Sequence, residues 1–282
     1  MTSAVCVFAV CRTGTSAGLS TTHGHPQGGP VTLLALDDHL SAVVQEVPAA
    51  RFTEEALKER LSDRAELEAC ARAHHATVSA AAARGSVVPL PLATLFTDQD
   101  RARSALSECL PRFREALAHV EGRAEWAIKV YLRQDPHPPP VATATPAPAS
   151  ATVADVSAGR GAGRAYLARV RDREGSRRDR RDTGVAAAGR VHRAAAAAAV
   201  GCVQRRPHGQ DITGKQRLQV MNAAYLVDQE RAGDLRAAVD ALTGDLTAIG
   251  VEVEVSGPWV PYSFTEPSDA VAAQDTTRRS AS

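Results

Sequence analysis

The chain has 282 residues and almost balanced charge, with 33 basic and 32 acidic side chains. At 44% hydrophobic and 23% charged residues it has the composition of a globular protein, and its length favours two domains. No apolar run approaches the roughly 20 residues of a membrane-spanning helix, and residues 1–10 lack the basic start of a signal peptide, so we expect a strand there.

The first part of the chain predicts three strands. Residues 5–10 are an apolar run, and residues 31–36 and 41–47 form a predicted hairpin that is split by a pair of aspartates. Residues 14–30 between these runs are rich in Gly and Pro and therefore predict a loop.

Helix start signals follow. Thr53 is a candidate N-cap, with Phe52 and Leu57 at the spacing of a hydrophobic staple. Asp63 is a second candidate cap, with Glu66 at the capping-box spacing. From there one helical face carries the apolar stripe Leu67, Cys70, Ala71, His74, Val78 and Ala81.

Residues 86–92 contain two prolines and are expected to be extended, because a proline biases its predecessor away from the helical region. A second helical stripe follows, interrupted at Pro111, where we expect a kink or a new helix. Its members are Leu106, Leu110, Phe113, Leu117 and Val120. After Gly122, residues 123–132 alternate in hydrophobicity around Trp126 and predict a strand.

Residues 135–156 are rich in Pro and Ala and predict a linker between a first domain, residues 1–134, and a second, residues 157–265. The second domain is expected to open with an Arg-rich helix that three glycines weaken. Residues 185–200 predict a separate, alanine-rich helix.

The end of the second domain predicts a strand at 218–227, a helix along Leu235–Ile249 and a strand at 251–255. This order is typical of a right-handed βαβ unit with parallel strands. Two prolines in residues 256–264 should stop the last strand. Residues 266–282 are polar and expected to be disordered.

No catalytic, metal-binding or cofactor-binding motif emerges. The five cysteines lack metal-ligand spacing and are interpreted as reduced thiols of a cytoplasmic protein. His74 and His75 are adjacent on a helix and point in different directions, so packed histidines are favoured over a metal site. The glycines of residues 159–164 lack the context of a phosphate loop. Asn222 lies in phase with the apolar face of its strand, so a structural hydrogen bond is favoured over catalysis.

The middle of the chain is basic. Residues 135–217 carry 15 basic and 7 acidic side chains, a net charge of +8. Acidic residues interrupt the arginines of residues 160–206, so a solvated or protein-docking helix face is favoured over the alternative, a regulator that binds nucleic acid through this segment.

Several strings, in order along the chain, resemble one known family. The most specific is Ser256-Gly-Pro-Trp-Val-Pro-Tyr-Ser-Phe264, which resembles the Gly-Pro-Trp-Pro-Pro-Tyr-Ser-Phe motif of gas vesicle accessory proteins of types F and L, with Val260 where that family usually has Pro. Residues 220–228 and 122–131 are similar to two further family segments. The family-motif residues are Trp126, Asn222, Tyr225, Gly257, Pro258, Trp259, Pro261, Tyr262 and Phe264.

The resemblance implies a non-enzymatic cytoplasmic or vesicle-associated protein of gas vesicle assembly. It implies an α+β fold of two domains, the first a modified ferredoxin-like domain and the second with helices packed on the βαβ unit. The implied partners are the small hydrophobic shell protein and other accessory proteins. Trp259 and Tyr262 would be either interface anchors or rings that fix the last strand, and we expect the packing role.

Overall fold

The computed structural model describes residues 3–14, 24–51, 56, 58, 62–133, 158–207 and 217–265. The predicted cap at Thr53, the linker and the C-terminal tail lie outside these residues. Contacts divide the chain into two compact units: residues 1–126 with 226–229 and 257–282, and residues 127–225 with 230–256. The domain boundaries expected from the sequence stay a prediction.

The first unit is built on an antiparallel sheet whose central strand is β1. The strands are β1 (Ser3–Arg12), β2 (Val31–Ala35), β3 (Leu40–Pro48), β4 (Val87–Pro89) and β5 (Leu95–Phe96). Their order is β2-β3-β1-β4, and β5 also pairs with β1. The predicted hairpin is confirmed as β2 and β3, with Val31 opposite Gln45. No pattern in the sequence predicted the two-residue β5.

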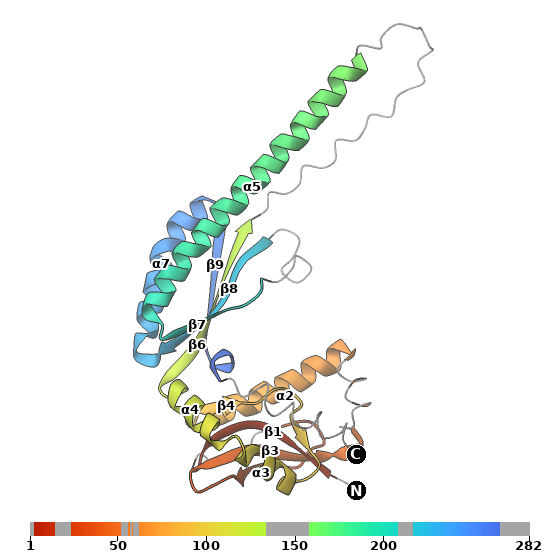
Figure 1. Cartoon of the computed structure of the whole chain (residues 1–282), viewed down its shortest axis with the longest axis vertical. Coiled ribbons are helices and arrows are strands. Elements are labelled where there is room, and N and C mark those ends of the chain that lie inside the picture. Colours follow the sequence, from red (N-terminus) through yellow and green to blue (C-terminus); the bar gives the residue numbers. More distant parts are fainter. Residues whose placement is uncertain are drawn as a thin grey trace, which may run out of the picture. The chain divides into compact units, whose positions relative to one another are not determined.

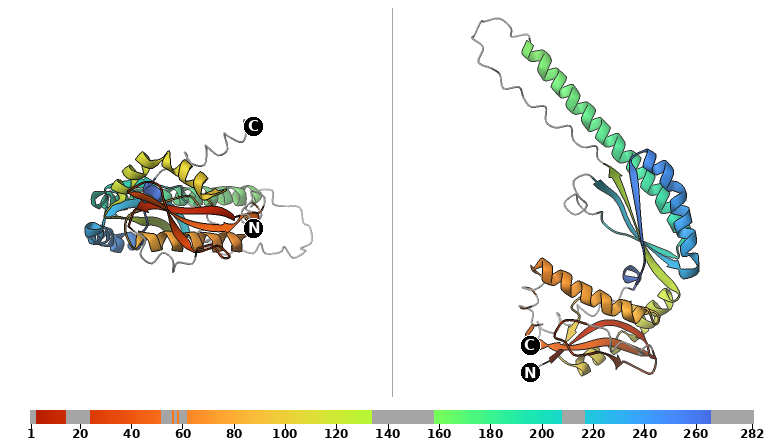
Figure 2. Two further views of the ribbon diagram at one scale, coloured as in Figure 1. Left: turned by 90° about the horizontal axis from the view of Figure 1, so that it is seen from below. Right: turned by 180° about the vertical axis from the view of Figure 1, so that it is seen from behind.

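Helices cover both faces of this sheet. They are α2 (Arg64–Ala82), α3 (Gln99–Ser107) and α4 (Leu110–Val120). One face of β1 packs on α3 and α4 and the other on α2, because both faces of the strand are apolar. Figure 2 (left) shows the sheet between these two layers.

The predicted helix signals of this unit are largely confirmed. The Asp63 carboxylate accepts hydrogen bonds from the backbone N–H groups of Ala65 and Glu66 and so caps α2. Pro111 lies in the first turn of α4, where its missing N–H costs nothing, and α3 ends before it. The predicted stripe on α2 was wrong at Leu67, which is 39% exposed, and at Ala71, which is also exposed. The buried face of this helix begins at Cys70 and continues through His74, Val78 and Ala81.

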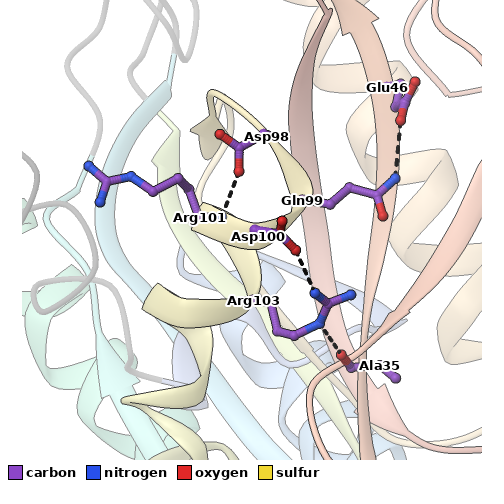
Figure 3. Close-up of polar contacts among 7 residues, drawn as sticks. All are labelled: Ala35, Glu46, Asp98, Gln99, Asp100, Arg101 and Arg103. Atoms are coloured by element: carbon purple, nitrogen blue, oxygen red, sulfur yellow. Dashed lines mark hydrogen bonds and ion pairs between the residues drawn. The ribbon is translucent and has the colours of Figure 1, made fainter.

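Polar contacts tie the start of α3 to the edge of the sheet (Figure 3). The Asp98 side chain accepts from the Arg101 N–H at 2.7 Å, which lowers the pKa of that carboxyl. Gln99 donates to Glu46 at 3.1 Å. Arg103 Nε donates to the carbonyl of Ala35, the last residue of edge strand β2, also at 3.1 Å. The helix therefore occupies one of the backbone acceptors that an edge strand leaves open.

The second unit contains a long helix, α5 (Ala158–Ala198), and a shorter one, α7 (Ala232–Ala248). The four-stranded sheet has the order β7-β8-β6-β9. Its strands are β6 (Arg123–Arg133), β7 (Gly201–Gln204), β8 (Arg217–Asp228) and β9 (Val251–Trp259).

The predicted βαβ unit needs a correction. β8, α7 and β9 follow one another as expected, but β8 and β9 do not pair, because β6 lies between them. The Gln229 N–H donates to the Gly122 carbonyl, so the end of β8 lies beside the start of β6. The Arg133 N–H donates to the Gly250 carbonyl, so the end of β6 lies beside the start of β9. β6 is therefore antiparallel to both neighbours.

Two further predictions were wrong. Helix α5 is one helix of 41 residues instead of two, because its glycines are tolerated. A side chain at Gly184 would lie 3.5 Å from Val220 and 3.6 Å from Leu132, so the small residue brings the helix close to the sheet. β9 does not stop before the prolines but runs through a cis Gly257–Pro258 bond to Trp259. It is an edge strand, where a proline need not donate to a neighbour.

A candidate protein-binding groove

A groove of about 670 Å³ lies on the first unit, where four chain segments meet. One wall is the C-terminal part of α2 with the following turn, residues 75–87. The family-motif segment, residues 256–264, contributes residues 258–261 to the lining. The start of β6 and Gln229 complete the lining, so the groove depends on residues that are far apart in the sequence.

Three rings lie together at the groove: His75 and Trp259 line it, and Tyr262 packs beside His75. The His75 ring centroid lies 6.2 Å from that of Trp259 and 6.1 Å from that of Tyr262. Trp259 and Tyr262 remain 46% and 38% exposed, respectively. Partial burial of the Tyr262 phenol raises its pKa to about 12, so it stays neutral. The packing role expected for Trp259 and Tyr262 therefore gives way to the other role considered, because large rings that are both fixed and exposed are typical of contact surfaces between proteins.

Residues of β6 hold the family-motif segment in place. The buried Glu125 carboxylate accepts hydrogen bonds from the Ser263 N–H at 2.8 Å and from the Ser263 hydroxyl at 3.0 Å. Gly257 has φ +144°, and a Cβ there would lie 2.9 Å from the Glu125 carbonyl and 3.0 Å from the Trp126 ring. Only glycine fits this position, because both the conformation and the space exclude a side chain.

The lining of the groove also carries polar groups. Arg123 lines it and forms an ion pair with Asp228 at 2.9 Å. Ser79 also lines it, with its hydroxyl 3.4 Å from His75 Nε2. A groove that combines exposed rings with hydrogen-bonding groups suits a partner chain that carries both apolar and polar side chains.

The structure brings together seven of the nine family-motif residues. All seven lie in the first unit: Trp126, Gly257, Pro258, Trp259, Pro261, Tyr262 and Phe264. Trp126 and Pro261 are buried, Phe264 is half-buried, and Pro258 is exposed. Val260, where the family usually has Pro, packs on the core between β1 and α2.

The two remaining family-motif residues lie in the second unit. Asn222 is buried on β8; its backbone carbonyl accepts from the Arg205 N–H at 2.8 Å, and its side chain reaches the Arg206 carbonyl at 3.5 Å. Tyr225 is fully buried, with its hydroxyl 2.8 Å from His192 Nδ1, and burial raises its pKa. Both contacts are structural ones within that unit.

His74, the neighbour of His75, points into the core. Its Nε2 lies 3.1 Å from the Leu90 carbonyl and its ring packs on Phe8. Burial, together with the nearby His25, lowers the pKa of His74 to about 4. In the described ranges, no group of three or more His, Cys, Asp or Glu side chains is placed to hold a metal ion. None of the helices that the structure describes is long and apolar enough for a membrane span.

Sequence reasoning missed His75 and Glu125 as parts of the groove. His75 lies about 100° round α2 from His74 and outside the core stripe, and nothing in the sequence places residue 259 against it. Glu125 is an acidic residue next to Trp126, and both faces of their strand are mostly buried. A carboxylate in such a strand requires hydrogen-bond donors, and this was the one signal available.

Comparison with known proteins shows which family the chain belongs to. The family model described as "Gas vesicle synthesis protein GvpL/GvpF" matches residues 4–266. Gas vesicle protein L of Streptomyces sp. (strain CB03234) is 34% identical over 240 residues, covering 85% of each chain.

Two crystal structures share the fold. The gas vesicle protein GvpF from Anabaena sp. PCC7120 aligns with a TM-score of 0.62 at 13% identity, over 95% of this chain and 98% of its own. GvpF from Microcystis aeruginosa aligns with a TM-score of 0.56 at 14% identity, over 93% and 99%. This chain therefore has the fold of helices and antiparallel sheets that these two structures share. The chain belongs to the GvpL/GvpF family of gas vesicle synthesis proteins, which is not a known enzyme family.

Proposed function

We propose that this chain is a non-enzymatic accessory protein of gas vesicle formation, which binds the small hydrophobic shell protein and other accessory proteins in the cytoplasm or on the vesicle. Membership of the GvpL/GvpF family over nearly the whole chain carries this proposal. We retain with it the finer description of a modified ferredoxin-like first domain, residues 1–134, and a second domain, residues 157–265.

The groove is the surface we propose for the shell protein. A small hydrophobic protein must be kept from premature self-association, and an accessory protein can do so by covering its apolar surface. The exposed ring of Trp259, fixed by His75 and by the rigid backbone around Pro258, supports this choice. A rigid ring contributes contact area at little cost in conformational entropy.

Co-purification tests the proposal. The tagged chain is co-expressed with the shell protein of the same organism, and the amount of shell protein retained is measured. We expect Trp259→Ala to reduce retention about tenfold or more, the effect of losing a central aromatic anchor.

The matched control is Leu67→Ala. Leu67 is also a large, exposed apolar side chain of the first unit, at 39% against 46% for Trp259, but it does not line the groove. Retention should stay unchanged in this variant. Absence of any binding by the wild-type chain, together with normal vesicles after clean deletion of its gene, would refute the proposed function.

A further inference from the structure

The N-terminal half of α5 has an exposed face that the second unit does not cover. Figure 1 shows α7 beside the C-terminal half of the helix and the N-terminal half extending beyond it, and the view from behind in Figure 2 agrees. Burial begins at Gly184, whereas Leu167 and Val185 are 54% and 55% exposed. A largely polar helix of this length needs either local charge pairs or a partner.

Leu167 and Val185 lie on the same face of α5. They are 18 residues apart, which is about five turns at 3.6 residues per turn, or roughly 27 Å along the axis. Six further residues lie within about 60° of the line that joins them, at roughly 100° per residue. This stripe is defined by the residues Leu167, Val170, Arg171, Glu174, Arg178, Arg181, Asp182 and Val185. Val170 is half-buried, and the other seven are exposed.

The stripe complements itself when its direction is reversed about residue 176. Reversal brings Glu174 opposite Arg178 at the centre, and the two apolar ends, Leu167 and Val185, opposite each other. On one flank Arg171 comes to lie beside Asp182. On the other flank Val170 meets the aliphatic part of Arg181, whose stem can cover an apolar side chain.

We propose that this stripe is a homodimer contact, in which α5 of one copy packs antiparallel on α5 of a second copy about a two-fold axis near residue 176. In a two-fold interface, a contact between residue i of one copy and residue j of the other is repeated between j of the first copy and i of the second. Each charged pair described above therefore occurs twice. This contact is separate from the groove and does not depend on the proposed function.

Charge favours a second copy over nucleic acid as the occupant. The stripe carries three arginines and two carboxylates, so its net charge is only +1. The carboxylate of Glu174 lies at its centre, where a phosphate backbone would be repelled. Opposite charges in a reversed register instead determine both the partner and its direction, as flanking charges do in coiled coils.

Paired charge reversals test the contact. Glu174→Arg makes both central positions basic, and Arg178→Glu makes both acidic, so each variant alone should repel its own copy. A mixture of the two restores both central pairs across the interface. Because Glu174 and Arg178 can also pair within one helix, only the mixture isolates the contact between copies.

Sedimentation velocity of the full chain at low salt supplies the measurement, from about 10 μM to about 500 μM, since an interface this small is expected to be weak. The wild type should shift from monomer to dimer, each single variant should require at least about fivefold higher concentration, and the equimolar mixture should return to the wild-type curve. Arg180→Glu, an equal charge reversal off the stripe, should leave the curve unchanged.

Three results would overturn the proposal. They are a wild type that stays monomeric throughout this range, a mixture that associates no better than its components, and an Arg180→Glu variant that weakens association as much as the central reversals. Far-ultraviolet circular dichroism of each variant verifies that α5 remains helical. A wild type that does not dimerise, but that lowers the electrophoretic mobility of DNA or RNA at low salt, would favour the nucleic-acid interpretation instead.

Discussion

The family-motif segment at residues 256–264 and the exposed half of α5 are stabilised in opposite ways. The segment is short and irregular, and contacts from distant parts of the chain hold it, above all the Glu125 carboxylate and the Trp126 ring. The helix is long and regular, and the described side chains of its N-terminal half are mostly exposed. Single substitutions should therefore be costly in the segment and mild in the helix.

The largest effect is expected for Gly257→Ala. The new side chain would meet the Glu125 carbonyl at 2.9 Å in a conformation that only glycine adopts readily, so we expect a loss of about 2–4 kcal/mol in the free energy of unfolding. Urea denaturation measures this loss. Gly85→Ala is the matched control, because no neighbouring atom lies within 4 Å of the added Cβ, and its effect should stay within about 0.5 kcal/mol.

The second prediction concerns pH and the core beneath the groove. The pKa of His74 is about 4 in the folded chain, below the ordinary value of 6.5, so the unfolded chain binds more protons between these values. Stability should therefore fall as the pH decreases from about 6.5 to about 4, by at most about 3 kcal/mol from this residue. The pKa values of Asp37 and Asp98 are lowered from 3.8, so these two groups reduce stability only at a pH below about 3.8.

Denaturation curves recorded across this pH range measure the effect. His74→Gln, which retains a donor for the Leu90 carbonyl but does not titrate, should flatten the dependence. An unchanged slope in this variant would show that another group causes the loss.

A smaller effect is expected for Ser263→Ala. The substitution removes one of the two hydrogen bonds that Ser263 donates to the Glu125 carboxylate and leaves the backbone donor in place. The expected loss is about 1.5–2 kcal/mol, the lower part of the usual range for a hydrogen bond to a charged acceptor, because the backbone N–H still donates. Ser104→Ala on the exposed face of α3 should not destabilise the chain in the same assay, and equal losses at both positions would contradict this role of Glu125.

The smallest effect is expected in the exposed half of α5. Gly175→Ala adds a Cβ with no atom within 4 Å, so it should stabilise the helix by about 0.5–1 kcal/mol. Circular dichroism during a thermal scan measures the helical signal. A loss of helicity in this variant would mean that the glycine is needed for something other than helix formation.

The sequence predicted the elements that local chemistry determines. Asp63 caps α2 and Pro111 separates α3 from α4, because a cap and a proline act through their immediate neighbours. Distant contacts defeated the same reasoning. The glycines of α5 suggested two helices, but packing of Gly184 on Leu132 favours one.

The groove shows the same limit. Its family-motif wall could be identified from the string at residues 256–264, whereas His75 could not, because only the fold brings α2 next to Trp259. Likewise, alternation predicted β6, β8 and β9 as strands, but not that β6 separates the other two. Strand order depends on which apolar faces meet, and a local pattern carries no information about that.

Photo-cross-linking at residue 259 tests the central claim most directly. A photoreactive amino acid replaces Trp259, or Leu67 as the control, in cells that express the shell protein. The account predicts a covalent adduct with the shell protein from position 259 and none from position 67. No adduct at 259, or equal adducts at both positions, would contradict a shell-protein site in this groove.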